Sequence, residues 1–263
     1  MTGTVTNFSY GAVTPIAAYL MATVGSALGL RCTTRSLRRP HHRGRWLALG
    51  SISFGCGIWA MHFTAMIGFD IEGVAVRYDR DQVFVSLAVV IVCVAAGMFL
   101  AGYRGRSAVI LTLAGIITGN GVVTMQGLGM SAIKIDGSLH YDGTIVILTF
   151  VFTLVITTVA LWGAVSIHAL WSSMGASLIM GVAVTGMHYI GMTALTIRLN
   201  GHTTIDESTS NLGFLMVMLA GPLLVLLVAT TIVMFDPDML DAEGDVDWAA
   251  HAPRGSGSAH PVR

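Results

Sequence analysis

Seven continuous apolar stretches run through this sequence, and each is long enough to cross a lipid bilayer as a single helix. An α-helix needs about 20 apolar residues to span the ~30 Å hydrocarbon layer. We predict spans at 11–30, 46–69, 82–102, 108–130, 144–165, 171–195 and 212–235. A membrane β-barrel is excluded, because its strands would appear as alternating segments of about ten residues. The predicted fold class is therefore an all-α membrane protein.

The composition agrees with a membrane location. Hydrophobic residues make up 54% of the chain, charged residues make up 11%, and the mean hydropathy is +0.75. Soluble domains carry about 25% charged residues. We expect a multi-pass protein of the inner (plasma) membrane, with the lipid bilayer as a partner and no nucleic-acid partner. The sequence contains no Ser-His-acid grouping, Gly-rich phosphate loop or paired intramembrane carboxylates, so we do not expect an enzyme.

Three of the predicted spans end in a similar six-residue word. The words are MHFTAM at 61–66, MQGLGM at 125–130 and MHYIGM at 187–192, and their first residues are 64 and 62 positions apart. A glycine stands six residues before each word, which indicates a longer repeating unit and permits close helix packing. We predict three helical-hairpin repeats, each ending in a word, followed by one additional helix.

The spacing inside each word suits a site for a soft metal. The second and sixth residues of a word are i,i+4 neighbours on one helix face, so both can approach one point. These pairs are His62 and Met66, Gln126 and Met130, and His188 and Met192. The first residues, Met61, Met125 and Met187, lie about 100° round the helix and form either a second site, further ligands at a helix seam or a packing layer.

Several alternatives stay open from the residues alone. Methionine fills gaps in membrane cores, so the words could preserve packing without any metal. A haem or electron-transfer protein would use His62 and His188 as paired axial ligands. A copper transporter or chaperone would need ligands through the depth of the bilayer. Such ligands could come from Met21, Met98, Met174 and Met180, but these show no paired polar pathway.

The arginines predict the topology. The segment from Arg31 to Arg45, predicted to be a loop, holds six Arg, and Arg104 and Arg106 lie in the connection between the third and fourth spans. Basic connections remain in the cytoplasm. We therefore expect residues 1–10 outside and residues 11–235 in the membrane. The remaining residues, 236–263, are expected to be a disordered acidic cytoplasmic tail with no catalytic domain.

The words resemble those of the MHYT family of bacterial membrane sensor domains. The segments at 57–63 (GIWAMHF) and 186–192 (GMHYIGM) carry the resemblance. It implies a copper ion held near the outer face by Met and His side chains, and a response to oxygen, carbon monoxide or nitric oxide. Many relatives carry modules for cyclic-di-GMP synthesis or hydrolysis, so we expect this chain to signal through a separate cytoplasmic effector.

The middle word departs from the family pattern. Gln126 stands where the family has His, Gly127 replaces an aromatic residue, and Phe63 in the first word replaces Tyr. An amide oxygen is a poorer copper ligand than imidazole. We therefore expect His62 and His188 as principal ligands, with thioether support. Tyr189, and Phe63 at the equivalent position, are the expected contacts of a diatomic ligand, although an interfacial aromatic belt would also explain Tyr189.

Overall fold

Seven long helices make up most of the protein. The computed structural model describes residues 5–6, 10–71, 77–105, 107–134, 137–167, 170–199 and 211–235. The helices are α1 (Val13–Arg38), α2 (Arg43–Ile67), α3 (Arg80–Arg104), α4 (Ala108–Ser131), α5 (Gly143–Ser166), α6 (Leu170–Met192) and α7 (Asn211–Met234). Each is long and apolar enough to cross a membrane, which confirms an all-α, multi-pass membrane protein. Arg106, the predicted tail 236–263 and most of the predicted segment 1–10 lie outside the described residues.

The first helix is longer than predicted. It continues to Arg38, and only the short 3-10 turn η1 (Pro40–His42) separates α1 from α2. The prediction of a loop from Arg31 to Arg45 was therefore wrong over most of its length. Arginine has a high helix propensity, so the helix continues after the apolar pattern stops. Arg35 gains a tertiary contact there, since its guanidinium group donates a 3.0 Å hydrogen bond to the carbonyl oxygen of Val233 in α7.

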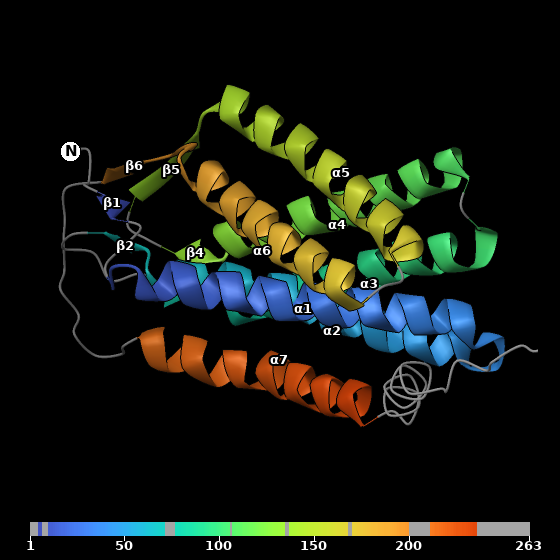
Figure 1. The fold of residues 1–263 in the computed structure, drawn as a ribbon. Helices are drawn as coiled ribbons and strands as arrows, with labels where there is room; N and C mark the ends of the chain where they lie inside the picture. Colours follow the sequence, from blue (N-terminus) through green and yellow to red (C-terminus); the bar gives the residue numbers. More distant parts are fainter. Residues whose placement is uncertain are drawn as a thin grey trace, which may run out of the picture.

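Helices α1 to α6 form a closed ring in which each helix packs against the next and α6 packs against α1. Helix α7 lies outside this ring, along α2 and α1 (Figure 1). The α1–α2 and α3–α4 hairpins pack closely, as the repeats predicted. In the third hairpin, α5 contacts α4 more than it contacts α6, and α6 contacts α1 most. The ring is therefore loosest between α5 and α6.

Three glycines join the repeats to one another, which confirms the predicted close helix approach. Each lies six residues before a word, and a Cβ atom added to it would come closer than 3.0 Å to a side chain of the first helix of another repeat. Real Cβ atoms essentially never come so close when the neighbour is fixed. The pairs are Gly55 with Ile91 of α3, Gly119 with Leu154 of α5, and Gly181 with Thr23 of α1. The same contact thus occurs three times around the ring.

Short antiparallel ribbons, which the sequence analysis did not predict, lie at one end of the bundle (Figure 1). The paired strands are β1 (Val5–Thr6) with β2 (Asp70–Ile71), β3 (Arg77–Tyr78) with β4 (Ile133–Lys134), and β5 (Gly137–Tyr141) with β6 (Leu195–Leu199). Each ribbon pairs the strand that precedes a helical hairpin with the strand that follows the word of the same hairpin. We call this end of the bundle the ribbon end; α2, α4 and α6 all finish there.

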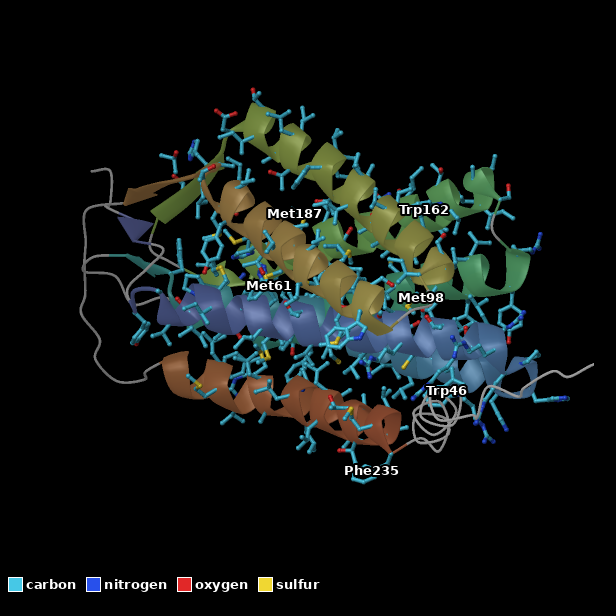
Figure 2. The ribbon with its side chains drawn as sticks, viewed as in Figure 1. Trp46, Met61, Met98, Trp162, Met187 and Phe235 are labelled. Carbon is cyan, nitrogen blue, oxygen red and sulfur yellow. The ribbon has the colours of Figure 1, made fainter. Side chains whose placement is uncertain are left out.

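The interior of the bundle is mainly apolar, and some of its buried polar groups pair with one another. Trp59 is fully buried, and its indole N–H donates a 3.0 Å hydrogen bond to the hydroxyl of Ser86 in α3. Figure 2 shows Met61 and Met187 in the half of the bundle nearer the ribbon end, and Trp46 near the opposite end. The words therefore lie inside the bundle, close to one of its ends.

Candidate metal centre

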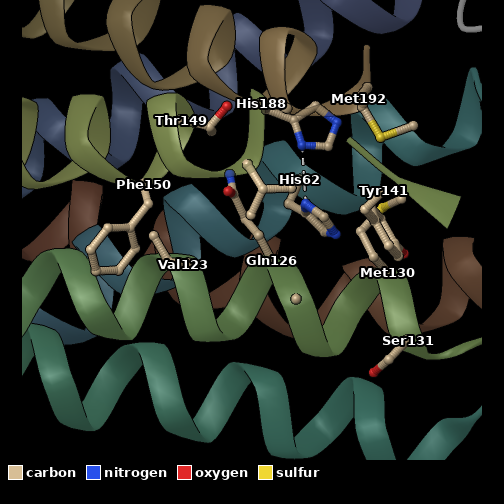
Figure 3. Close-up of a pocket in the computed structure, with 13 residues that line it drawn as sticks. His62, Val123, Gln126, Met130, Ser131, Tyr141, Thr149, Phe150, His188 and Met192 are labelled. Carbon is tan, nitrogen blue, oxygen red and sulfur yellow. Dashed lines mark hydrogen bonds between the residues drawn. The ribbon is translucent and has the colours of Figure 1, made fainter. Parts of the chain in front are cut away.

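The ends of α2, α4 and α6 meet around one cavity of about 390 Å³. His62, Gln126 and His188, the second residues of the three words, all line it (Figure 3). The remaining lining residues are Val123, Gly127, Met130, Ser131, Tyr141, Val146, Thr149, Phe150, Gly191 and Met192. The repeat therefore brings its three polar positions to one place, although they are far apart in the sequence.

The two histidines contact each other directly. Their Nδ1 atoms are 3.1 Å apart, and the rings meet edge to face with centroids 4.8 Å apart. Both side chains are buried, with exposed fractions of 0% for His62 and 4% for His188. Two imidazole nitrogens at this distance share one proton as donor and acceptor, or hold one cation between their lone pairs. The pair is thus a polar centre in a mainly apolar cavity.

The second ring nitrogen of His62 lies against α4. Its Nε2 atom is buried without a hydrogen-bond partner among the residues that the structure describes. A Cβ atom on Gly129 would collide with this nitrogen, so glycine at that position gives the imidazole its space. A buried polar atom without a partner costs about 1–3 kcal/mol. This nitrogen is therefore open to a ligand or a water molecule.

The geometry of the pair fits a metal ion bound by both imidazoles. Two metal–nitrogen bonds of about 2.0 Å at a tetrahedral angle place the nitrogens about 3.3 Å apart. Among the described residues, no group of three or more His, Cys, Asp and Glu could hold a metal ion. The sulfur ligands that the cavity offers beside the imidazoles are thioethers, which favour Cu(I).

The six methionines of the words do not all reach the cavity. Met130 and Met192 line the cavity beside the histidines, whereas the buried Met66 does not. The first residues of the words belong instead to the apolar core: Met61, Met125 and Met187. The Met187 thioether there accepts a 2.6 Å hydrogen bond from the Thr153 hydroxyl. This arrangement favours a packing layer for the first methionines over a second metal site.

Gln126 enters the cavity from α4, as Figure 3 shows. Its amide nitrogen is buried and has no hydrogen-bond partner among the described side chains and backbone. A side-chain amide donates two hydrogen bonds, so this group is available to an acceptor atom of a ligand. Gln126, which is expected to bind metal less well than the two histidines, therefore offers a hydrogen-bond donor to a ligand in the cavity.

The two aromatic residues of the words support the histidines from outside the cavity. The Phe63 ring lies edge-on to His62 at a centroid distance of 4.9 Å, and the Tyr189 ring lies likewise against His188 at 5.4 Å. Neither ring lines the cavity. Both fix the orientation of a neighbouring imidazole, and contact with a diatomic ligand stays a prediction for them.

One wall of the cavity comes from residues that the sequence analysis did not identify. Val146, Thr149 and Phe150 of α5 and Tyr141 of β5 line it. The only local signal was a hydroxyl residue within an apolar span, and the Thr149 hydroxyl donates to the carbonyl oxygen of Ile145. These residues face the site because α5 packs on α4 and leaves a space beside α6.

Comparison with known proteins identifies the repeat. Residues 55–114 and 119–177 match the MHYT family model, described as a bacterial signalling protein N terminal repeat. The two matches begin at Gly55 and Gly119, the glycines that join repeats in the ring. No solved protein structure matches this chain.

Curated relatives are longer signalling proteins. The chain is 26% identical over 244 residues to the bifunctional diguanylate cyclase/cyclic di-GMP phosphodiesterase MucR of Pseudomonas aeruginosa, covering 90% of this chain and 36% of MucR. It is 26% identical to the cyclic di-GMP phosphodiesterase NbdA of the same organism, covering 78% of this chain and 27% of NbdA. It is also 26% identical to the signaling protein YkoW of Bacillus subtilis, covering 58% of this chain and 20% of YkoW. The chain thus spans about a third or less of the length of these relatives.

Proposed function

Because the chain belongs to the MHYT family of bacterial signalling proteins, we propose that it is a membrane sensor that binds a copper ion between α2, α4 and α6. The single observation that carries this proposal is the buried pair of His62 and His188, with Nδ1 atoms 3.1 Å apart in a cavity that two thioethers also line. We assign the imidazoles as principal ligands and Met130 and Met192 as supporting ligands. Copper bound there would supply a redox-active centre and an open position for a diatomic gas.

The protein contributes the rigid surroundings of the pair. Phe63 and Tyr189 hold the imidazoles edge-on, and Gly129 leaves space beside the Nε2 atom of His62. Metal binding at the pair requires the proton between the two Nδ1 atoms to leave, so it would couple metal occupancy to the contact between α2 and α6. Helix α6 packs loosely on α5, which allows it to shift when that contact changes.

We propose that the ribbon end faces the outside and that the opposite end passes the signal to a cytoplasmic effector. The opposite end carries the basic residues of α1 and η1, including Arg35 and Arg38, as basic residues of cytoplasmic connections do. Reporter fusions after Arg39 and after Gly73 should report opposite compartments, cytoplasmic and external respectively. The same compartment for both would contradict the seven-span orientation.

The two alternative functions have less support. A haem iron between two axial histidines would separate their ligating nitrogens by about 4 Å, twice a metal–nitrogen bond of about 2.0 Å, and would place the porphyrin between the rings. His62 and His188 are instead in direct contact at 3.1 Å. For a transporter, Met98 and Met180 line a separate cavity of only about 20 Å³, and the side chain of Met174 is exposed.

Elemental analysis of protein purified without a metal-affinity tag tests the proposal. We expect about one copper ion per chain in the natural protein and a loss of most of it in the His62→Ala, His188→Ala double variant. The control is His41→Ala, an exposed histidine at the opposite end of the bundle. Unchanged copper content in the double variant would overturn the proposal.

A further inference from the structure

The first and second repeats differ at one matched set of positions, and the difference leaves free space beside the site. In the first repeat the His62 ring contacts Phe63, and Phe63 contacts Tyr78 with ring centroids 6.5 Å apart. Tyr78 immediately precedes Asp79, whose carboxylate caps α3. The three rings thus fill the region between the word and the following ribbon.

The second repeat has the same order of word, tyrosine and capping aspartate, but it lacks a ring equivalent to that of Phe63. Tyr141 immediately precedes Asp142, whose carboxylate caps α5 just as Asp79 caps α3. The residue equivalent to Phe63, however, is Gly127. It lines the cavity, and a Cβ atom added to it would meet no atom within 4 Å. Tyr141, which has no ring from α4 to pack on, is 47% exposed and lines the same cavity.

The empty place has the characteristics of a site for a flat ring. Gly127 and Tyr141 border it on the ribbon side, and Phe150 of α5 supplies a further aromatic surface. Gln126 provides a buried amide N–H group without an acceptor. The volume of about 390 Å³ lies within the range of small-molecule sites and far exceeds the volume of a diatomic gas.

Access to this place is from the membrane. Gly127 and Val146 both line the cavity and are exposed on α4 and α5, which are membrane-spanning helices. Val123 of α4 and Phe150 of α5 add further apolar wall surface on this side. A ligand that enters here is therefore soluble in lipid, and it carries an acceptor oxygen that can reach Gln126.

We propose that the cavity binds a membrane quinone, whose ring takes the place of the missing aromatic side chain at position 127 and whose carbonyl oxygen accepts a hydrogen bond from Gln126. The quinone ring lies between Tyr141 and Phe150, next to the histidine pair but not between its two rings. Quinone binding does not require copper, so this inference stands apart from the proposed metal centre.

Photolabelling of the metal-free protein tests this inference. The full chain, purified in detergent and treated with a chelator, is irradiated with an azido-ubiquinone analogue, and labelled peptides are identified by mass spectrometry. We expect label on peptides of α4, β5 and the first half of α5, and suppression of that label by excess decylubiquinone. Label spread over all seven helices, or label that decylubiquinone does not reduce, would overturn the proposal.

Two variants locate the site. Gly127→Phe should restore the missing ring, fill the space and lower competable labelling at least tenfold, because the glycine has room for a side chain. Gly213→Phe, on α7 and also with no atom within 4 Å of an added Cβ, is the matched control and should label as the natural protein does. Gln126→Leu, which keeps a similar volume, should weaken decylubiquinone competition about fivefold, the value of one hydrogen bond of about 1 kcal/mol.

The thermal unfolding temperature of each variant shows whether it is folded. The proposal would be contradicted if the Gly127→Phe variant folds and is labelled as strongly as the natural protein. If Gly127→Phe does not fold, Gln126→Leu alone decides it, and competition equal to that of the natural protein would overturn it. Failure of the copper proposal would appear in the metal content of the histidine variants and would leave these labelling results unchanged.

Discussion

His62 of α2 and His188 of α6 are 126 positions apart in the sequence, and their Nδ1 atoms are 3.1 Å apart in the fold. They occupy the same position in two copies of one repeat, so their contact results from the ring in which the repeats close on themselves. The third copy places Gln126 at the same cavity. The internal repeat has thus produced one site whose three equivalent positions hold two histidines and one glutamine.

The histidine contact should be measurable as a coupling free energy. His62→Ala or His188→Ala leaves the other buried imidazole without its partner, so each should cost about 1–3 kcal/mol of unfolding free energy in the metal-free protein. The double variant should lose clearly less unfolding free energy than the two single variants added together, because the contact can be lost only once. Denaturation in mixed micelles measures all three values. Additive losses would show that the two side chains do not interact.

A third imidazole should strengthen the site. Gln126→His places it in the same cavity as the natural pair, so Cu(II) affinity should rise tenfold or more, because imidazole binds copper far better than an amide. Competition with a chromogenic Cu(II) chelator gives the affinity. The control Asn120→His adds a histidine at an exposed position of α4 and should leave the value unchanged. Equal affinities for both variants would count against convergence of the three words.

The methionines should differ in their effect on Cu(I). Met192 lines the cavity and Met66 does not, although each is four residues from a histidine in its own word. Met192→Leu should therefore weaken Cu(I) retention several-fold, while Met66→Leu should change it little. Titration with bicinchoninate measures the retention. A larger loss in Met66→Leu than in Met192→Leu would reverse our assignment of the thioethers.

The stability of the helix ring should depend on the three glycines that precede the words. A Cβ atom at Gly119 would be 2.7 Å from the side chain of Leu154, so Gly119→Leu should separate α4 from α5 and cost about 1–3 kcal/mol or more. At Gly221 of α7 an added Cβ would meet no atom within 4 Å, so Gly221→Leu is the matched control. Thermal unfolding in detergent compares the two. Similar melting temperatures would show that the close approach is not required.

The membrane helices and the three words could be predicted from the sequence because each depends on a local pattern. An apolar run of about 20 residues has few alternatives to a spanning helix, and a repeat of constant period predicts equivalent positions. The glycine contacts followed from the same period. The family resemblance added the expectation of copper, which the fold makes geometrically reasonable through His62 and His188.

Other features could not be predicted because they depend on tertiary contacts. The two-residue strands at 5–6 and 70–71 are too short to show an alternating pattern, and they form only because the loops meet. The α1 helix continues beyond the apolar pattern because arginine tolerates a helix, and Arg35 finds a hydrogen-bond partner in α7. Tyr141 and Phe150 became wall residues through the packing of α5 on α4, for which the sequence has no local signal.

X-ray absorption at the copper edge of the loaded protein tests the central claim most directly. We predict two imidazole nitrogens per copper at about 2.0 Å, and one or two sulfur atoms at about 2.3 Å, from bonds typical of such ligands. In the His188→Ala variant, the imidazole scattering should fall by at least half. Copper coordinated without imidazole in the natural protein, or an unchanged spectrum in this variant, would contradict the account of a shared histidine site.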